Sequence, residues 1–248
     1  MTMMKRSDGR VKAKYFAAKD YSDRSVYERF QNWKKSNPNV ILVSSGTYTD
    51  DYDKPQGLAI DNGVVVNRTL IKDRMHALTI VYASGGIAVS DIREGNLTIS
   101  GGSYASSEPL DITDPKDLAR FIKWAQDQEA TVFQTHLLVY RDQLEISSTN
   151  SSKTKRERRF LAVGKDEDGD IVHVVVQHPK YASLYSASKN THQFLTDFQD
   201  LEIIFMINLD TGNQDVFELY NSNCTKNTSV KGRQPLSKAV NLLVYHFQ

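Results

Sequence analysis

Short stretches of strand-forming residues, repeated along the whole chain, constrain the fold more than any other feature of this sequence. About a dozen of them alternate with turn residues, and helical segments are spread among them. Residues 203–209 form an almost unbroken apolar run, so both faces of that strand should be covered. The sequence therefore predicts an α+β fold, with a mixed, mostly antiparallel sheet core of many short strands and about three packed helices.

Local signals predict where the helices lie. Ser25 and Glu28 form a capping box, and the helix that they open should end before Pro38. A second helix should begin at Pro115, a residue type that favours the first turn. A third is expected over residues 186–198. The side chains expected to face inward from it are Phe194, Leu195 and Phe198.

The clearest hairpin is centred on Asn62-Gly63, because these residues favour the positive φ angles of a type I′ turn. Residues 166–170 predict the turn of another hairpin. They are not read as a calcium loop, because Gly169 comes one place too early and no helices flank it. The strands are expected at residues 40–43, 57–60, 64–67, 78–82, 87–90, 97–100, 132–140, 144–147, 160–163, 172–177, 203–209, 216–220 and 242–247.

The charge balance limits the class of partner. Lys and Arg number 31 and Asp and Glu number 30, which leaves a formal net charge of +1. This removes the electrostatic case for a nucleic-acid partner, and the basic run at residues 153–159 is typical of a solvated loop. Cys224 is the single cysteine and the six histidines lack metal spacing. No disulfide, no metal and no cofactor are therefore expected.

The termini and apolar runs bear on localisation. The longest apolar run, residues 203–209, is too short to span a membrane. Residues 1–14 are basic, but no apolar segment of the kind found in secretory signals follows them. No membrane span is expected. The location stays open between the cytoplasm, a virion, and a mature form shown without its leader.

Polar residues at the ends of three strands are the candidates for chemistry. Residues 44–50 follow a buried strand, where free backbone N–H groups could point at an anion or a sugar hydroxyl. Asp210 follows the most buried strand, where a half-desolvated carboxylate gains a useful pKa. Arg159 enters a short apolar strand, where its fork could bind a phosphate or a carboxylate. Ordinary turn chemistry and a surface arginine are the alternatives.

Short motifs containing these residues follow one another in a fixed order. They are Ser44-Ser45-Gly46-Thr47-Tyr48 with Lys54-Pro55-Gln56-Gly57-Leu58, Phe133-Gln134-Thr135-His136-Leu137-Leu138, Arg159-Phe160-Leu161-Ala162-Val163-Gly164, Ile207-Asn208-Leu209-Asp210, and Pro235-Leu236-Ser237 with residues 239–243. The series resembles the phosphodiester glycosidase family, to which the catalytic domains of uncovering enzymes belong. The resemblance implies a phosphodiester glycosidase-like domain over residues 40–248. Residues 1–39 would be an N-terminal extension and a helix packed on it.

The resemblance also implies a reaction, the hydrolysis of a glycosyl-1-phosphodiester bond. Arg159 would bind the phosphate, and Asp210 would act at the anomeric centre, on the developing oxocarbenium charge or the attacking water. The residues expected to bind sugar or phosphate are Ser44, Ser45, Gly46, Thr47, Gln134, Asn208 and Gly212. The expected partner is a glycosyl phosphodiester or a phosphate-containing glycan.

The sequence departs from the family at two places. Ser44 stands where the family has Asn, and residues 211–215 replace its glycines and serine. Asp215 would bring a negative charge near the presumed phosphate, which is unfavourable unless a nearby cation neutralises it. These departures favour a rival hypothesis, a catalytically degenerate member that acts as a carbohydrate-binding or structural module of a phage particle or a bacterial surface assembly. A depolymerase acting on a phosphate-linked polymer is a third, and would need a wider open cleft.

Overall fold

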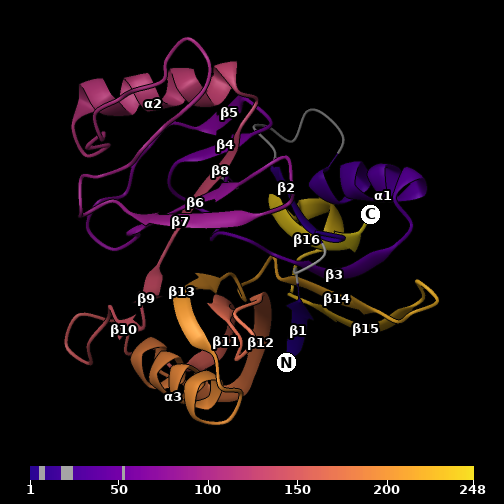
Figure 1. Cartoon of the computed structure of the whole chain (residues 1–248). Coiled ribbons are helices and arrows are strands. Elements are labelled where there is room, and N and C mark those ends of the chain that lie inside the picture. The colour runs from indigo at the N-terminus through magenta and orange to yellow at the C-terminus, as the bar shows by residue number, and fades with distance from the viewer. Residues whose placement is uncertain (6–8, 18–24, 52–53) are drawn as a thin grey trace.

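The computed structural model describes residues 1–5, 9–17, 25–51 and 54–248 of the chain (Figure 1). Its helices are α1 (Val26–Ser36), α2 (Pro115–Asp127), α3 (Leu184–Asp197) and the short 3₁₀ helix η1 (Leu236–Lys238). Its strands are β1 (Thr2–Lys5), β2 (Val11–Ala17), β3 (Val40–Ser44), β4 (Ala59–Asp61), β5 (Val64–Asn67), β6 (Ala77–Val81), β7 (Ile87–Asp91), β8 (Thr131–Thr135), β9 (Leu137–Tyr140), β10 (Gln143–Leu144), β11 (Arg156–Lys165), β12 (Ile171–Ala182), β13 (Glu202–Leu209), β14 (Val216–Tyr220), β15 (Lys226–Lys231) and β16 (Asn241–Phe247). The predicted α+β class is confirmed.

The strands of the described residues form three antiparallel sheets. The first has the order β1-β12-β11-β13-β9-β10, the second β15-β14-β3-β16-β2, and the third β5-β4-β8-β6-β7. In Figure 1, α2 covers the third sheet at the top, α3 lies against the first at the bottom, and α1 lies beside the second. β1 pairs with β12 and β2 with β16, so strands from residues 1–39 extend two of the sheets. The division of the chain at residue 39 stays a prediction.

One hydrophobic cluster joins the three sheets. Leu161 of the first sheet, Leu42 of the second and Phe133 of the third belong to it, and each is fully buried. Smaller clusters lie under α1, α2 and α3. Because burial of apolar surface dominates folding, this shared cluster fixes the sheets against one another. It thereby fixes the strand ends where the candidate residues lie.

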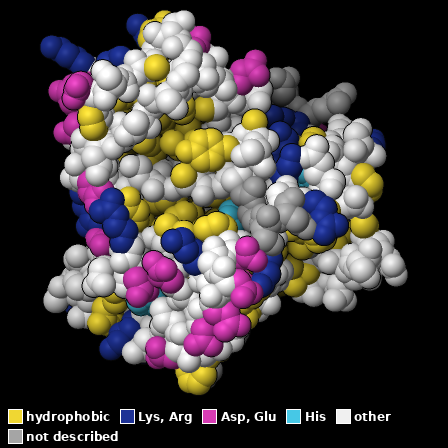
Figure 2. Space-filling view, in the orientation of Figure 1, with side chains coloured by type: hydrophobic (Ala, Val, Ile, Leu, Met, Phe, Trp, Pro, Cys, Tyr) yellow, Lys and Arg dark blue, Asp and Glu magenta, His cyan; other side chains and the backbone are white. Residues whose placement is uncertain are grey.

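Charged side chains are dispersed over the face of the molecule that Figure 2 shows. Lys and Arg lie among Asp and Glu, and hydrophobic side chains show between the upper and lower sheets. This face carries no concentrated basic surface. Among the described residues, no helix is both long enough and apolar enough to cross a membrane.

The strand predicted over residues 132–140 is two strands in two different sheets. β8 pairs with β4 and β6, whereas β9 pairs with β13. The change occurs at His136, whose carbonyl accepts a hydrogen bond from the backbone N–H of Asn208 at 3.1 Å. A continuous run of buried residues on either side of His136 hides the switch from any periodicity analysis. The prediction of one strand was therefore wrong.

The inward face predicted for the third helix was right for Leu195 and wrong for the two phenylalanines. Leu195 is fully buried, but Phe194 and Phe198 are 40% and 73% exposed. The helix begins at Leu184, and its buried residues recur at helical spacing from there, so the two phenylalanines lie on the outer side. A strand at residues 97–100 is absent as well, because Leu97 makes a single bridge with Leu110.

Several other local predictions are confirmed, whereas the strand predicted over residues 144–147 is reduced to β10, Gln143–Leu144. The Ser25 hydroxyl accepts a hydrogen bond from the Glu28 backbone N–H at 3.2 Å and caps α1, and Pro115 opens α2. Asn62 and Gly63 have φ angles of 50° and 76° between β4 and β5, as a type I′ turn requires. These features are decided by residues that are adjacent in the sequence, which is why the sequence alone predicts them.

Candidate functional site

The strand ends that the sequence singled out meet in one place. The Asp210 backbone N–H, just after β13, donates to the Gly46 carbonyl after β3 at 2.9 Å. β11 runs beside β13, with Arg159 opposite Leu209. Ser45 lies against β14, where its backbone N–H donates to the Val216 carbonyl at 2.8 Å. Segments far apart in the sequence therefore form a single cluster.

A buried ion pair between Arg159 and Asp215 lies at the centre of this cluster. Arg159 Nη1 is 2.6 Å from Asp215 Oδ1, and Nη2 is 3.1 Å from Oδ2, so the pair is bidentate. The Arg159 side chain has no exposed area and that of Asp215 is 6% exposed. Asp215 thus neutralises the arginine within the protein, in the manner that a phosphate would.

The remaining contacts of Arg159 are also with the protein. Its Nε donates to Gln177 Oε1 at 2.8 Å, and its Nη1 is 3.3 Å from Ser44 Oγ. The guanidinium carbon lies 4.4 Å from the centre of the Phe217 ring. The role of Arg159 as a phosphate ligand stays a prediction. The structure adds that Asp215 occupies its fork and that solvent does not reach it.

Asp210 has a different environment. It is 5% exposed, and its Oδ1 accepts a hydrogen bond from the Gly212 backbone N–H at 2.8 Å. Burial raises the pKa of Asp210 to about 6, and the negative charge of Asp215 adds to the increase, while the Gly212 N–H and Arg159 oppose it. A Cβ on Gly212 would lie 3.0 Å from Asp210 Oδ1, so only glycine allows this close approach without a shift. The carboxyl group can exchange a proton near neutral pH.

A polar cavity of 310 Å³ opens beside Asp210. Its walls come from the segment after β3, the start of β11, and the turn between β13 and β14. The described residues that line it are Tyr48, Thr49, Asp50, Asp51, Arg156, Asp210, Gly212, Asn213, Gln214 and Gln234. Asp210 is the buried carboxyl group of this cavity, and Arg156 supplies a cation.

Two buried polar atoms near Tyr48 have no hydrogen-bond partner among the described residues, Arg158 Nε and Asn208 Oδ1. Arg158 is 3% exposed, and burial lowers its pKa, while the neighbouring Tyr48 hydroxyl opposes that change. Asn208 Nδ2 donates to the Tyr48 hydroxyl. Neither Arg158 nor Asn208 lines the cavity of Asp210, whereas Tyr48 does. Tyr48 therefore belongs with Asp210 in the candidate site, and Asn208 supports it through that hydrogen bond.

The other predicted residues support the cluster from behind. Asn241 holds the segment after β3, since its Oδ1 accepts from the Gly46 N–H at 3.0 Å and its Nδ2 donates to the Thr47 carbonyl at 2.9 Å. The Thr47 hydroxyl donates to the Gln134 carbonyl at 2.6 Å. The Gln134 side chain in turn holds the segment around Ile71. Gly46, Thr47 and Gln134 do not line the cavity of Asp210.

Two residues of the site were missed by the sequence analysis. Arg156 lines the cavity, but the sequence shows it only as part of a basic run. At this end of β11 the pairing with β12 is irregular, because Arg156 lies opposite Ala182 and Arg158 opposite His178, so the extra residues are in β12. Tyr48 was part of the first motif without a role. Its ring lies edge-on to that of His136, with the ring centres 5.3 Å apart. Tyr48 and His136 belong to two of the motifs, so a contact between these motifs was the signal that could have pointed to Tyr48.

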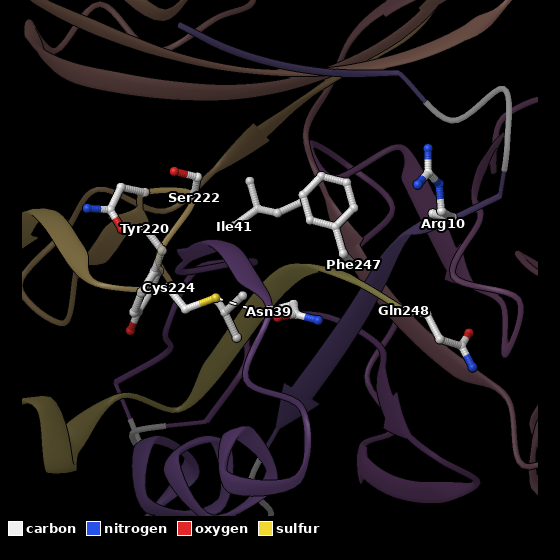
Figure 3. A pocket seen from close by; sticks show the side chains of 10 residues that line it. Arg10, Asn39, Ile41, Tyr220, Ser222, Cys224, Phe247 and Gln248 are labelled. Atoms are coloured by element: carbon white, nitrogen blue, oxygen red, sulfur yellow. Dashed lines mark hydrogen bonds between the residues drawn. The ribbon is translucent and has the colours of Figure 1, made fainter.

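Two other features of the described residues lie outside this cluster. A cavity of 430 Å³ lies where the chain ends, lined by Arg10, Asn39, Ile41, Tyr220, Cys224 and Phe247 among others (Figure 3). Its described lining includes no carboxyl side chain, so it lacks a group for acid–base work.

The turn with Asp166, Asp168 and Asp170 brings three carboxylates within 4.8 Å of one another. Lys5 Nζ is 2.5 Å from Asp166 Oδ2 and supplies a positive charge there.

Comparison with known proteins supports the fold. The sequence matches no protein-family model and no curated protein. The structure is similar to the catalytic domain of zebrafish N-acetylglucosamine-1-phosphodiester alpha-N-acetylglucosaminidase, auto-inhibited by its pro-peptide, with a TM-score of 0.51 and 14% identity over 96% of this chain and 73% of that chain. It is also similar to a hypothetical protein from Synechocystis, with a TM-score of 0.49 and 12% identity over 98% of this chain and 58% of that chain. The likeness to the zebrafish domain shows a related fold.

Proposed function

We propose that this chain hydrolyses a glycosyl-1-phosphodiester in the cavity of Asp210. One observation carries the proposal: a buried carboxyl group with a pKa of about 6 opens onto a polar cavity that also contains Arg156. Catalytic carboxyl groups are commonly tuned in this way by burial. The motifs that resemble phosphodiester glycosidases contribute Asp210 and Asn208 to the same place.

The chemistry requires few groups. Water attacks the anomeric carbon, the bond from that carbon to the phosphate oxygen breaks, and the oxygen leaves with the phosphate. The leaving monoester ionises at about pH 6 or below, so it departs without the general acid that an ordinary glycoside needs. The Asp210 carboxylate accepts the proton of the water or stabilises the oxocarbenium charge. One carboxylate and one cation are enough for this scheme.

We assign the phosphate to Arg156 and a positioning role to Arg159. Arg156 lines the cavity of Asp210, whereas Arg159 is held by Asp215 and has no exposed area. Tyr48, which lines the same cavity, would bind a hydroxyl group of the sugar. Arg159 then keeps the ends of β11 and β14 in register around the reacting centre.

The test is a turnover assay with purified protein. The substrates are methyl esters of sugar-1-phosphates, beginning with N-acetylglucosamine because the similar zebrafish domain is named for that sugar. Wild type should release free sugar, and Asp210→Asn should lower the rate by about 10²–10⁴-fold. Asp200→Asn, on an exposed turn with φ of 50°, is the matched control and should keep the wild-type rate. Equal rates in wild type and Asp210→Asn would falsify the proposal.

A second candidate function is a binding module without catalysis. The ion pair of Arg159 with Asp215 favours it, because an acidic side chain occupies the fork that the family resemblance assigns to phosphate. Such a module would serve in a phage particle or a surface assembly that carries phosphate-containing glycans. The same assay separates the two functions. Binding of the methyl esters by wild type, with no sugar released at any pH from 4 to 9, supports the module.

A further inference from the structure

A groove with basic walls continues from the cavity of Asp210. It has a volume of 610 Å³ and shares Arg156, Gly212 and Asn213 with that cavity. It runs between the start of β11, the end of β12, the turn between β13 and β14, and the end of β15 with the segment that follows it. The described residues that line it are Thr154, Arg156, Glu157, Tyr181, Thr211, Gly212, Asn213, Asp215, Val230, Lys231, Gly232 and Arg233.

The far wall of this groove is held rigidly by backbone contacts. The Gly232 N–H donates to the Asp215 carbonyl at 2.8 Å, and the Gln234 N–H donates to the Asn213 carbonyl at 2.9 Å. A Cβ on Gly232 would lie 2.3 Å from the Asn213 oxygen, so only glycine fits between the two segments. These contacts fix Lys231 and Arg233, on either side of Gly232, against the turn that carries Asp210.

The charges of the two spaces differ in sign. Asp50, Asp51 and Asp210 line the cavity, whereas Lys231 and Arg233 line the groove, and Arg156 lies at the junction. The acidic residues that line the groove are Asp215, which is paired with Arg159, and Glu157. A chain of phosphates extending from Arg156 would be repelled by the cavity and attracted by the groove.

We propose that the groove binds a second phosphate-linked unit of the substrate, so that the substrate is a glycan whose sugars are joined through phosphodiesters. This inference rests on the proposed function, since it takes the reacting phosphate to lie at Arg156. The reacting sugar lies in the cavity, and the chain that leaves with the phosphate follows Lys231 and Arg233. Tyr181, which is 73% exposed, offers its ring to the apolar face of a sugar in that chain.

Binding to the slow Asp210→Asn variant tests this inference by calorimetry. The two ligands are the methyl ester of a sugar-1-phosphate and an oligomer of three sugars joined by 1-phosphodiesters. We expect the oligomer to bind at least about tenfold tighter, because its added phosphates gain charge-assisted hydrogen bonds from the groove. The difference should shrink in high salt, since the groove is open to solvent.

The double substitution Lys231→Glu and Arg233→Glu should abolish the preference for the oligomer. Lys165→Glu with Lys189→Glu, an equal change of charge at exposed positions outside the groove, is the control and should retain it. Equal affinities for the two ligands, no binding of either, or a preference that survives the double substitution would overturn the inference. A preference for the oligomer in a wild-type protein that releases no sugar would instead contradict the proposed function and leave the groove as a binding site.

Discussion

Two charged centres lie side by side in this molecule and differ in almost every physical respect. Around Arg159 and Asp215, positive and negative charges are paired in a bidentate contact away from solvent. Around Asp210, a carboxyl group with a raised pKa opens onto a polar cavity, and nearby buried atoms of Arg158 and Asn208 are left without partners. The first centre is complete within the protein, and the second is not.

The comparison shows why charge type alone does not identify a reactive residue. An arginine that is bidentate to a carboxylate and fully enclosed by the protein is not accessible to substrate, whatever motif it lies in. A carboxyl group that is buried without a cation bound to its oxygens has a raised pKa. Such a group can exchange a proton during a reaction near neutral pH. On these grounds we treat Arg159 with Asp215 as the structural centre and Asp210 with Arg156 as the reactive one.

The largest expected effect is on the structural centre. Arg159→Ala should lower the free energy of unfolding by about 3–5 kcal/mol, because it leaves the Asp215 charge buried and unpaired. Arg156→Ala should change that free energy by less than about 0.5 kcal/mol, because Arg156 is exposed. Urea denaturation of both variants measures the difference. Equal stability of the two would contradict the division into two centres.

The next effect concerns the reactive centre and is set by pH. Burial raises the pKa of Asp210 from 3.8 to about 6, so the folded protein holds this proton more tightly than the unfolded chain. The associated stability is full below pH 4 and is lost as the pH rises through 6, to a total of about 3 kcal/mol. Asp210→Asn should therefore be more stable than wild type at pH 8 by up to that amount, with a small difference at pH 4. Stability curves that run parallel from pH 4 to 8 would argue against it.

The smallest effect is at Ser44, where the resembling family has Asn. Ser44 is fully buried, and its hydroxyl donates to the Ser45 carbonyl at 2.8 Å and lies 3.3 Å from Arg159 Nη1. Ser44→Ala should cost about 0.5–1.5 kcal/mol, because Arg159 keeps its other acceptors. Ser44→Asn should cost more, since a larger amide must enter a filled space. Thermal denaturation tests the order, and a stabilising Ser44→Asn would show that the space can accept the family residue.

The sequence was sufficient for features that neighbouring residues decide. The Ser25 cap, the turn at Asn62-Gly63 and the start of α2 at Pro115 are examples. It failed where distant segments decide, as at His136, where the chain leaves one sheet for another. Phe194 was misplaced because the buried face of its helix follows small residues, Ala187, Ser188 and Thr191, rather than the phenylalanines.

The site divides in the same way. Strand ends predicted from polar residues after apolar runs do meet, since Asp210 bonds to Gly46 across the sheets. The charge of Asp215 indicated that a cation must lie nearby, but only the fold shows that this cation is Arg159. Arg156 lies beyond an irregularity in the pairing of β11 with β12, and only the folded arrangement of the strands shows that it lines the cavity.

The pH dependence of kcat/KM for a sugar-1-phosphodiester is the most direct test of the central claim, that Asp210 is the reactive carboxyl group. Phosphodiesters do not titrate between pH 4 and 9, so the profile reports ionisations of the free enzyme. In the proposed mechanism the Asp210 carboxylate is the active form, so kcat/KM should rise with pH and level off above a midpoint of about 6. The residual rate of Asp210→Asn should lack this rise. A wild-type profile that is flat through pH 6, or a rise that persists in Asp210→Asn, would contradict the account.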